Sequence, residues 1–217
     1  MVTETRSGPG VGQPRISAAP GDLEIVQRFV NTLDIESGTD ELDSPAGLTG
    51  WLAGRGLMAP AGPGDVPVSP SFLKTAVALR EALRGVLSSH VPAPGTPDGA
   101  QAHAAAAELR KAAGTLRIRI EVGDDGRVAP VPAGVGVTAA LTRILLIVAE
   151  AERAGTWSRL KACSAGDCRW VFYDRSPTRS GCWCSMRICG SRAKSRAYRR
   201  RAEAGPGGDL GDLRIET

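Results

Sequence analysis

The sequence predicts a mainly α-helical protein with one small β-hairpin, followed by a compact cysteine-rich module that ends in a basic helix. Three observations predict this architecture. Apolar residues recur at helical spacing through most of the chain, one short stretch alternates with period two, and all five cysteines of the 217 residues lie within 163–189. A hydrophobic fraction of 42% and a charged fraction of 23% are ordinary for a soluble globular protein.

Composition divides the chain into four segments. Residues 1–20 and 205–217 are rich in small and polar residues, and we expect both to be disordered tails. Between them, residues 21–158 should form a helical domain, and residues 159–204 the cysteine module. The N-terminus has no apolar run behind its first arginine, and no stretch is long enough to cross a bilayer. We therefore expect no membrane association and a cytoplasmic location.

Helices are predicted from apolar spacing and from capping residues. The second helix should have Ser44 as its N-cap and Pro45 at its first position. The third is the clearest amphipathic helix, and Arg80 and Arg84 should lie on its polar face. The expected helices are residues 22–34, 43–57, 69–90, 100–113, 136–155 and 190–204.

A β-hairpin is expected at residues 116–132, where the period changes to two. A GDDG turn separates the alternating stretch from RVAPV, which favours two antiparallel strands. The apolar members of the first strand are Leu116, Ile118, Ile120 and Val122, and they alternate with Arg117, Arg119 and Glu121.

The five cysteines form two pairs and one remainder. Cys163 and Cys168 have four residues between them, as do Cys184 and Cys189, and fifteen residues separate the pairs. Two short loops that each turn two thiolates toward one point are typical of tetrahedral zinc sites, and four thiolates leave no position for water. The spacing therefore predicts one structural Zn²⁺ per chain. Cys182 is left out, because using it in place of Cys184 would break the symmetry of the pairs.

Other uses of the cysteines remain open. Two disulfides are disfavoured because cytoplasmic thiols are kept reduced. Unpaired cysteines in a core are a second alternative, and an iron–sulfur cluster, which also takes four thiolates, is a third.

Charge is distributed unevenly along the chain. The stretch 161–201 holds eleven Lys or Arg and two Asp, a net charge of +9, whereas the rest of the chain carries a net charge of −5. A strongly basic end on a mildly acidic body favours a polyanionic partner for that end.

The stretch CSAGDCRWVFYDRSPTRSGCWCSMRICGSRAKSRAYRRR, residues 163–201, resembles the CGNR zinc finger. That family has two cysteines, an Arg-Trp-Phe-Tyr-Asp stretch, then Cys-Ser-Met and Cys-Gly-Asn-Arg leading into a basic helix. Two positions depart from it: Ser191 stands where the family has asparagine, and Cys182 where it often has arginine. The matching residues are Arg169, Trp170, Phe172, Tyr173, Asp174, Trp183, Cys184, Ser185, Met186, Cys189, Gly190, Arg192, Lys194 and Arg199.

The preceding part of the chain resembles the ABATE domain, which normally comes before this finger. FVNTLD (29–34), LTGWLAGRGL (48–57), LREALR (79–84) and the hairpin follow the order of that family. The family is described as stress-induced transcription regulators, so the resemblance implies a regulator.

The last expected helix, GSRAKSRAYRRRAEA at 190–204, carries the cationic residues of the basic end. Gly190 should permit the backbone turn, Ser191 should be the N-cap, and Tyr198 can face the zinc site. A solvated face is one interpretation of the cations, and phosphate contact, on a helix that zinc holds rigid, is the other. The candidate nucleic-acid-binding residues are Arg192, Lys194, Arg196, Arg199, Arg200 and Arg201.

We therefore expect a bacterial, non-enzymatic transcription regulator whose basic helix binds double-stranded DNA. The helical domain should sense a small-molecule effector or form a homodimer, and Asn31 and Asp34 are candidate pocket residues. The alternative is an RNA- or protein-interaction module attached to a small-molecule-binding domain. An enzyme is the least favoured reading, because neither His90 nor His103 has a nucleophile motif nearby.

Overall fold

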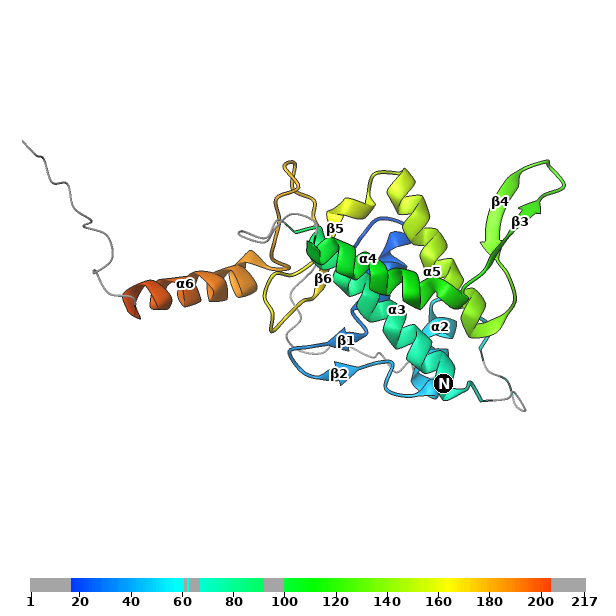
Figure 1. Cartoon of the computed structure of the whole chain (residues 1–217), viewed down its shortest axis with the longest axis horizontal. Coiled ribbons are helices and arrows are strands. Elements are labelled where there is room, and N and C mark those ends of the chain that lie inside the picture. Colours follow the sequence, from blue (N-terminus) through cyan, green and yellow to red (C-terminus); the bar gives the residue numbers. More distant parts are fainter. Residues whose placement is uncertain (1–16, 61, 63–66, 92–99, 204–217) are drawn as a thin grey trace, which may run out of the picture.

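The computed structural model describes residues 17–60, 62, 67–91 and 100–203, and helices dominate this part of the chain (Figure 1). The strands form antiparallel pairs, β1 (Leu33–Asp34) with β2 (Thr39–Asp40), β3 (Ile118–Val122) with β4 (Val128–Pro132), and β5 (Leu160–Ala162) with β6 (Val171–Tyr173). The helices are α1 (Leu23–Val30), α2 (Pro45–Gly54), α3 (Pro70–Ser89), α4 (Ala100–Ala112), α5 (Gly136–Arg153) and α6 (Ser191–Glu203), with short turns η1 (Ala113–Thr115), η2 (Trp157–Arg159) and η3 (Met186–Gly190).

The mainly helical fold class is confirmed, and β3–β4 is the expected hairpin. Capping follows the sequence signal at α2, where Ser44 Oγ accepts a hydrogen bond from the Gly47 N–H at 3.0 Å and Pro45 takes the first position. The pairs β1–β2 and β5–β6 are two and three residues long, too short to give a period-two signal, and the sequence did not predict them.

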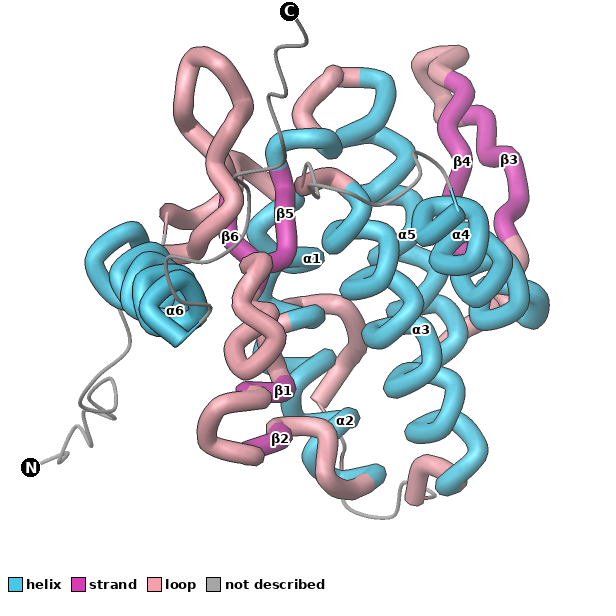
Figure 2. Tube along the Cα trace, turned by 60° about the vertical axis from the view of Figure 1, so that its left-hand side comes forward, coloured by secondary structure: helices cyan, strands magenta, loops and turns pink. Residues whose placement is uncertain are grey.

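One hydrophobic core joins the helical domain to the start of the cysteine module. It is built from α1, α2, α3 and α5, and it includes Leu160 and Val171 from the strands β5 and β6, both fully buried. Strand β5 packs beside α3 and strand β6 beside α1 (Figure 2). The domain boundary drawn between residues 158 and 159 therefore falls within a shared core.

Residues 17–20, the described end of the expected tail 1–20, are bonded to this core. The Ala19 N–H donates to Gln27 Oε1 at 2.7 Å, and Gln27 Nε2 donates to the carbonyl oxygens of Ser17 at 3.1 Å and Val171 at 3.2 Å. Ala19 itself is buried. The expectation of a disordered tail is wrong for residues 17–20, because these hydrogen bonds tie them to α1 and β6. Residues 1–16 and 204–217 lie outside the described residues.

Arg80 and Arg84 are buried in α3, contrary to the expectation that they lie on its polar face. Arg80 Nη1 lies 2.6 Å from Asp40 Oδ1, and Arg84 Nη2 donates to the Val30 carbonyl oxygen at 2.6 Å. Desolvation lowers the pKa of Arg84, although the neighbouring Glu81 opposes this shift. The sequence did not reveal that these arginines are buried, because the partners Asp40 and Val30 lie 40 and 54 residues away along the chain.

The β3–β4 hairpin and α6 extend from opposite sides of the body (Figure 1). Among the described residues, no helix combines the length and the apolar character that a membrane crossing requires.

Candidate metal centre and nucleic-acid interface

Four cysteines meet at one point between β5, β6 and η3. The Sγ atoms of Cys163, Cys168, Cys184 and Cys189 all lie within 4.8 Å of one another, and three of these residues are buried. Cys163 directly follows the buried strand β5, and the loop after it closes when the Cys168 N–H donates to the Ala165 carbonyl oxygen at 2.9 Å. The two short loops predicted from the spacing thus turn their thiols toward each other.

The donor set and its dimensions fit one zinc ion. A tetrahedral site with zinc–sulfur bonds of 2.3 Å places its sulfur atoms about 3.8 Å apart. The Sγ of Cys184 lies 3.7 Å from that of Cys168 and 3.6 Å from that of Cys189. None of the five cysteines is in a disulfide. The four thiols would supply a closed tetrahedral shell, so the ion they hold is structural.

Ionisation of the four thiols is strongly interdependent. Hydrogen bonds from Cys168 and Cys184 lower the pKa of Cys163 to about 2, and the same contact with Cys163 raises the pKa of Cys168 to about 12. The pKa of Cys184 is also raised, first by its hydrogen bond with Cys163. One thiolate therefore keeps its neighbours protonated. Because zinc ligands must be deprotonated, binding of the ion displaces these protons and depends on pH.

Cys182 lies outside the group of four, as its exclusion from the ligands predicted. Its carbonyl oxygen accepts a hydrogen bond from the Ser164 N–H at 2.9 Å, which links the second cysteine loop to the first. Its thiol is half-buried, and burial raises the pKa of that thiol.

A buried ion pair organises the spacer between the cysteine pairs, and the sequence did not reveal it. Lys161 Nζ lies 2.8 Å from Asp174 Oδ2 and also donates to the carbonyl oxygens of Arg179 and Gly181. The Gly181 N–H donates to the same carboxylate at 2.8 Å. Burial alone would raise the pKa of Asp174, but hydrogen bonds from Lys161 and Ser176 lower it well below its ordinary value.

Gly181 is required at its position by close packing. A Cβ atom there would lie 2.9 Å from the carboxylate of Asp174. The loop thus approaches the buried carboxylate through a residue without a side chain, a role that no local sequence signal marks.

The candidate pocket residues Asn31 and Asp34 serve the fold instead. Asn31 Nδ2 donates to the Val171 carbonyl oxygen at 2.9 Å, and its Oδ1 accepts the Val171 N–H at 2.8 Å. Asp34 Oδ1 accepts the N–H groups of Glu36 at 3.0 Å and Ser37 at 3.3 Å. Both side chains are hydrogen-bonded to backbone groups, and these structural roles replace their assignment to a ligand pocket. Asn31 holds β6 against α1, and Asp34 shapes the turn between β1 and β2.

The basic helix starts earlier than the sequence predicted. Ser185 caps the π-helical turn η3, since its Oγ accepts the Ile188 N–H at 3.3 Å, and η3 continues directly into α6. Ser191, the expected N-cap, lies inside this continuous helix and donates from its Oγ to the Met186 carbonyl oxygen at 3.3 Å. Since Cys189 belongs to η3, the ion that it holds is attached to the first turns of the basic helix.

Gly190 also has a role other than the predicted one. Its backbone is not in the left-handed region, whereas a Cβ atom there would meet Met186 Sδ at 3.0 Å and Trp183 Cδ1 at 3.4 Å. Glycine at this position lets η3 approach the aromatic side chain of Trp183 next to the metal centre.

Two cations of α6 are paired with acids outside the helix, one in the helical domain and one in the first cysteine loop. Arg192 Nη1 lies 2.8 Å from Glu36 Oε1, and Arg196 Nη1 lies 3.3 Å from Asp167 Oδ2. All four side chains are between about a third and a half exposed, so each pair contributes little to stability. The two arginines can therefore exchange these carboxylates for other partners.

A shallow groove of about 560 Å³ runs along this face of η3 and α6. It brings Arg192, Arg196 and Arg199 together with Arg187, which the sequence analysis missed. The expected helix began at Gly190, and the five residues of the π-helical η3 carry no period of 3.6, so no local signal placed Arg187 with the other arginines. The other cations expected to bind nucleic acid are exposed but are not part of the groove: Lys194, Arg200 and Arg201.

Two family models match the chain, and together they cover nearly all of its described part. The model of the CGNR zinc finger matches residues 159–202, and the ABATE model, described as "Putative stress-induced transcription regulator", matches residues 23–155. The chain belongs to the ABATE family. Its cysteine module is a CGNR zinc finger, so the protein is a metal-binding regulator with one structural zinc site. A comparison with curated proteins found no match.

The aromatic residues of the CGNR finger are structural. Trp170 and Trp183 pack around the buried cysteines, and Phe172 and Tyr173 are buried on β6. These four residues therefore form a small core beside the metal centre and do not present a surface on which bases could stack. Tyr198 differs, because it is 72% exposed on α6 instead of facing the zinc site as expected.

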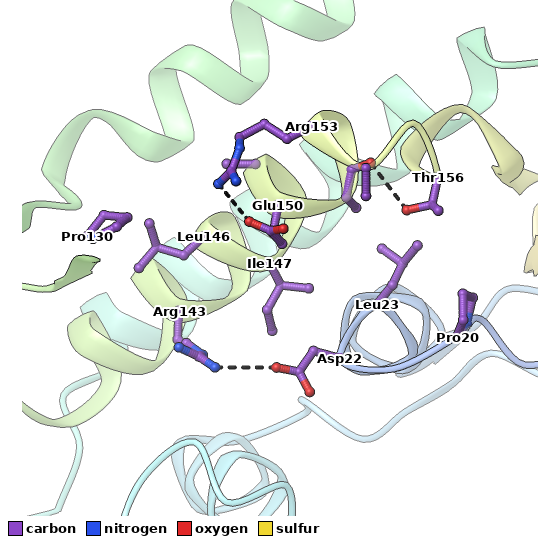
Figure 3. A pocket seen from close by; sticks show the side chains of 13 residues that line it. Pro20, Asp22, Leu23, Pro130, Arg143, Leu146, Ile147, Glu150, Arg153 and Thr156 are labelled. Atoms are coloured by element: carbon purple, nitrogen blue, oxygen red, sulfur yellow. Dashed lines mark hydrogen bonds and ion pairs between the residues drawn. The ribbon is translucent and has the colours of Figure 1, made fainter. Parts of the chain in front are cut away.

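The ABATE domain has a cavity of about 350 Å³ where the start of α1 meets β4 and α5 (Figure 3). Leu146 contributes to its apolar wall. Its charged side chains are paired with each other, Arg143 with Asp22 at 3.3 Å and Arg153 with Glu150 at 2.8 Å.

Proposed function

We propose that this ABATE-family protein is a non-catalytic, cytoplasmic transcription regulator that binds double-stranded DNA through η3 and α6. The four-cysteine zinc site fixes the start of this helix, and the ABATE domain anchors the finger through the shared core. Binding is carried by arginine contacts to phosphates, so affinity falls steeply with salt concentration.

The observation that carries the proposal is the arginine groove on a helix that extends from the body (Figure 1). Four arginines line it, and no acid follows within the helix until Glu203. A planar guanidinium suits bidentate contact with phosphate oxygens or guanine edges. Among the described residues, Arg187 and Arg199 have no ion-pair partner, so both are available to a polyanion.

The exposed pairs of Arg192 and Arg196 are compatible with this role. Glu36 and Asp167 hold the two guanidinium groups in place in the free protein, and phosphate oxygens can replace these carboxylates because the pairs face solvent. The two acids therefore do not prevent phosphate from binding to the arginines of the groove.

The test compares two variants that change the net charge equally. The zinc-loaded full chain is titrated onto labelled duplex DNA of mixed sequence at low salt, and binding is followed by fluorescence anisotropy. Arg187→Glu with Arg199→Glu should weaken binding at least about tenfold. Arg127→Glu with Arg153→Glu, two exposed positions away from α6, is the matched control and should bind like the wild type. Equal binding by all three proteins would exclude the groove as the contact surface.

Single-stranded RNA is the competing partner, favoured by one observation. The exposed ring of Tyr198 could stack on an unpaired base. Competition between duplex DNA and single-stranded RNA distinguishes the two, and preferential displacement by RNA, lost in Tyr198→Ala, would replace DNA as the partner.

A small-molecule effector is not part of the proposed function. The charged side chains of the cavity in Figure 3 are already paired with each other.

A further inference from the structure

The β3–β4 hairpin exposes an unusually apolar surface. Ile118, Ile120 and Val122 alternate along β3, and Val128 lies opposite Val122 on the same face. All four are more than half exposed, between 57% and 68%. Contiguous exposed apolar side chains of this kind mark a contact surface more often than scattered ones do.

The two edges of the hairpin differ in their free backbone groups. The Gly123 N–H donates to the Arg127 carbonyl oxygen at 2.8 Å, and the Ala133 N–H to the Arg117 carbonyl oxygen at 2.9 Å. Hydrogen-bonded pairs alternate with non-bonded ones in an antiparallel ladder, so residues 118, 120 and 122 and their partners 132, 130 and 128 point their backbone groups outward.

Prolines block one of these edges. Pro130 and Pro132 occupy two of the three outward positions of β4 and have no N–H to donate. The outer edge of β3 keeps all its donors and acceptors, at Ile118, Ile120 and Val122. Strand β4 packs beside α5, and β3 lies on the far side of the hairpin from the body in Figures 1 and 2. The edge that can pair is therefore the accessible one.

The free edge is complementary in charge to a copy of itself. In an antiparallel pair of two β3 strands centred on Ile120, Arg119 stands opposite the partner subunit's Glu121, and Glu121 opposite the partner's Arg119. These would be non-hydrogen-bonded positions, where opposing side chains come closest. The same register places Ile118 opposite the partner's Val122, so the apolar face continues across the junction.

We propose that the protein forms a two-fold symmetric homodimer by pairing β3 with β3 of a second copy. The junction turns two isolated hairpins, each of marginal stability alone, into one four-stranded sheet. It fills the free edge and brings the exposed isoleucine and valine side chains into lateral contact with those of the partner on the same face. The dimer does not depend on DNA binding, because α6 lies on the opposite side of the body (Figure 1).

The test measures the dimer dissociation constant of the zinc-loaded full chain by analytical ultracentrifugation without DNA. Arg119→Glu places glutamates opposite each other at both positions, and Glu121→Arg places arginines there. Each variant should dimerise at least about tenfold more weakly than the wild type. An equimolar mixture of the two variants should dimerise as well as the wild type, because every opposing pair is then of opposite charge.

Two controls separate pairing from general effects. The double variant Arg119→Glu with Glu121→Arg restores complementarity and should dimerise like the wild type. Arg127→Glu changes an exposed charge in the hairpin outside the paired register and should also leave the dimer unchanged.

A monomeric wild type at every concentration would overturn the proposal, as would a dimer that is unaffected by either charge reversal. A mixture of the single variants that dimerises no better than each variant alone would also overturn it. Since DNA is absent, these outcomes are separate from failure of the proposed function.

Discussion

The buried ion pair between Lys161 and Asp174 gives a sharp stability prediction. The two side chains are 2% and 4% exposed, and Nζ lies 2.8 Å from Oδ2. Replacing Asp174 with asparagine keeps the shape of the side chain and leaves the ammonium of Lys161 without its counter-charge. Removing one partner of a buried pair costs about 3–5 kcal/mol, because an uncompensated charge stays buried.

The lower end of that range applies here. Lys161 still donates to the carbonyl oxygens of Arg179 and Gly181, and the asparagine oxygen can still accept the Gly181 N–H. A loss of about 3 kcal/mol corresponds to a fall in melting temperature of about 6–12 °C for a chain of this size. Circular dichroism measures the transition, and zinc analysis should still find one ion per chain, because Asp174 is not a ligand.

Two further variants complete this experiment. Asp167→Asn is the control in the same finger, because its carboxylate is 53% exposed and its pair with Arg196 contributes less than about 1 kcal/mol. Lys161→Met with Asp174→Asn should recover part of the loss, since no charge is left buried. A melting temperature for Asp174→Asn no lower than that of Asp167→Asn would refute the account of the spacer.

Three other predictions concern the metal, the core and pH. Cys184→Ser should lose bound zinc by elemental analysis whereas Cys182→Ser keeps it, and the reverse pattern would overturn the ligand set. Arg84→Met should lower the free energy of unfolding in urea by about 3 kcal/mol, because carbonyl oxygens including that of Arg169 lose their buried donor; an unchanged midpoint would contradict this. On acidification, zinc should leave before the Asp174 ion pair breaks. The depressed pKa of Asp174 contributes stability that is present above about pH 4 and is lost only as the pH falls through the lower folded value. Zinc release and unfolding followed together against pH check this order, and loss of the pair first would contradict it.

Local patterns predicted much of the fold. The helical spacing, the cap at Ser44 and the hairpin all depend on residues close together in the chain. The four-cysteine cluster was predictable for the same reason, because the spacing within each pair determines how the loop turns. Cys182 was set aside on symmetry alone, and the structure also places it outside the cluster.

Interactions between distant segments were not predictable. Arg84 has the appearance of a surface residue on an amphipathic helix, yet it donates to carbonyl oxygens at the end of α1 and just after the first cysteine loop. Asn31 resembles a ligand group but is matched to the backbone of Val171, 140 residues away. The helix start at Ser185 was missed because η3 is a π-turn, whose five residues give no period of 3.6.

The salt dependence of duplex-DNA affinity tests the central claim most directly. For the zinc-loaded protein, the logarithm of the association constant should fall linearly with the logarithm of the salt concentration, by about 0.9 for each phosphate contacted. Arg187→Glu with Arg199→Glu should make that slope shallower by about 2, whereas the Arg127→Glu, Arg153→Glu control keeps the wild-type slope. The same steep slope in the groove variant, or no duplex binding by the wild type at low salt, would contradict a zinc-positioned arginine helix that binds DNA.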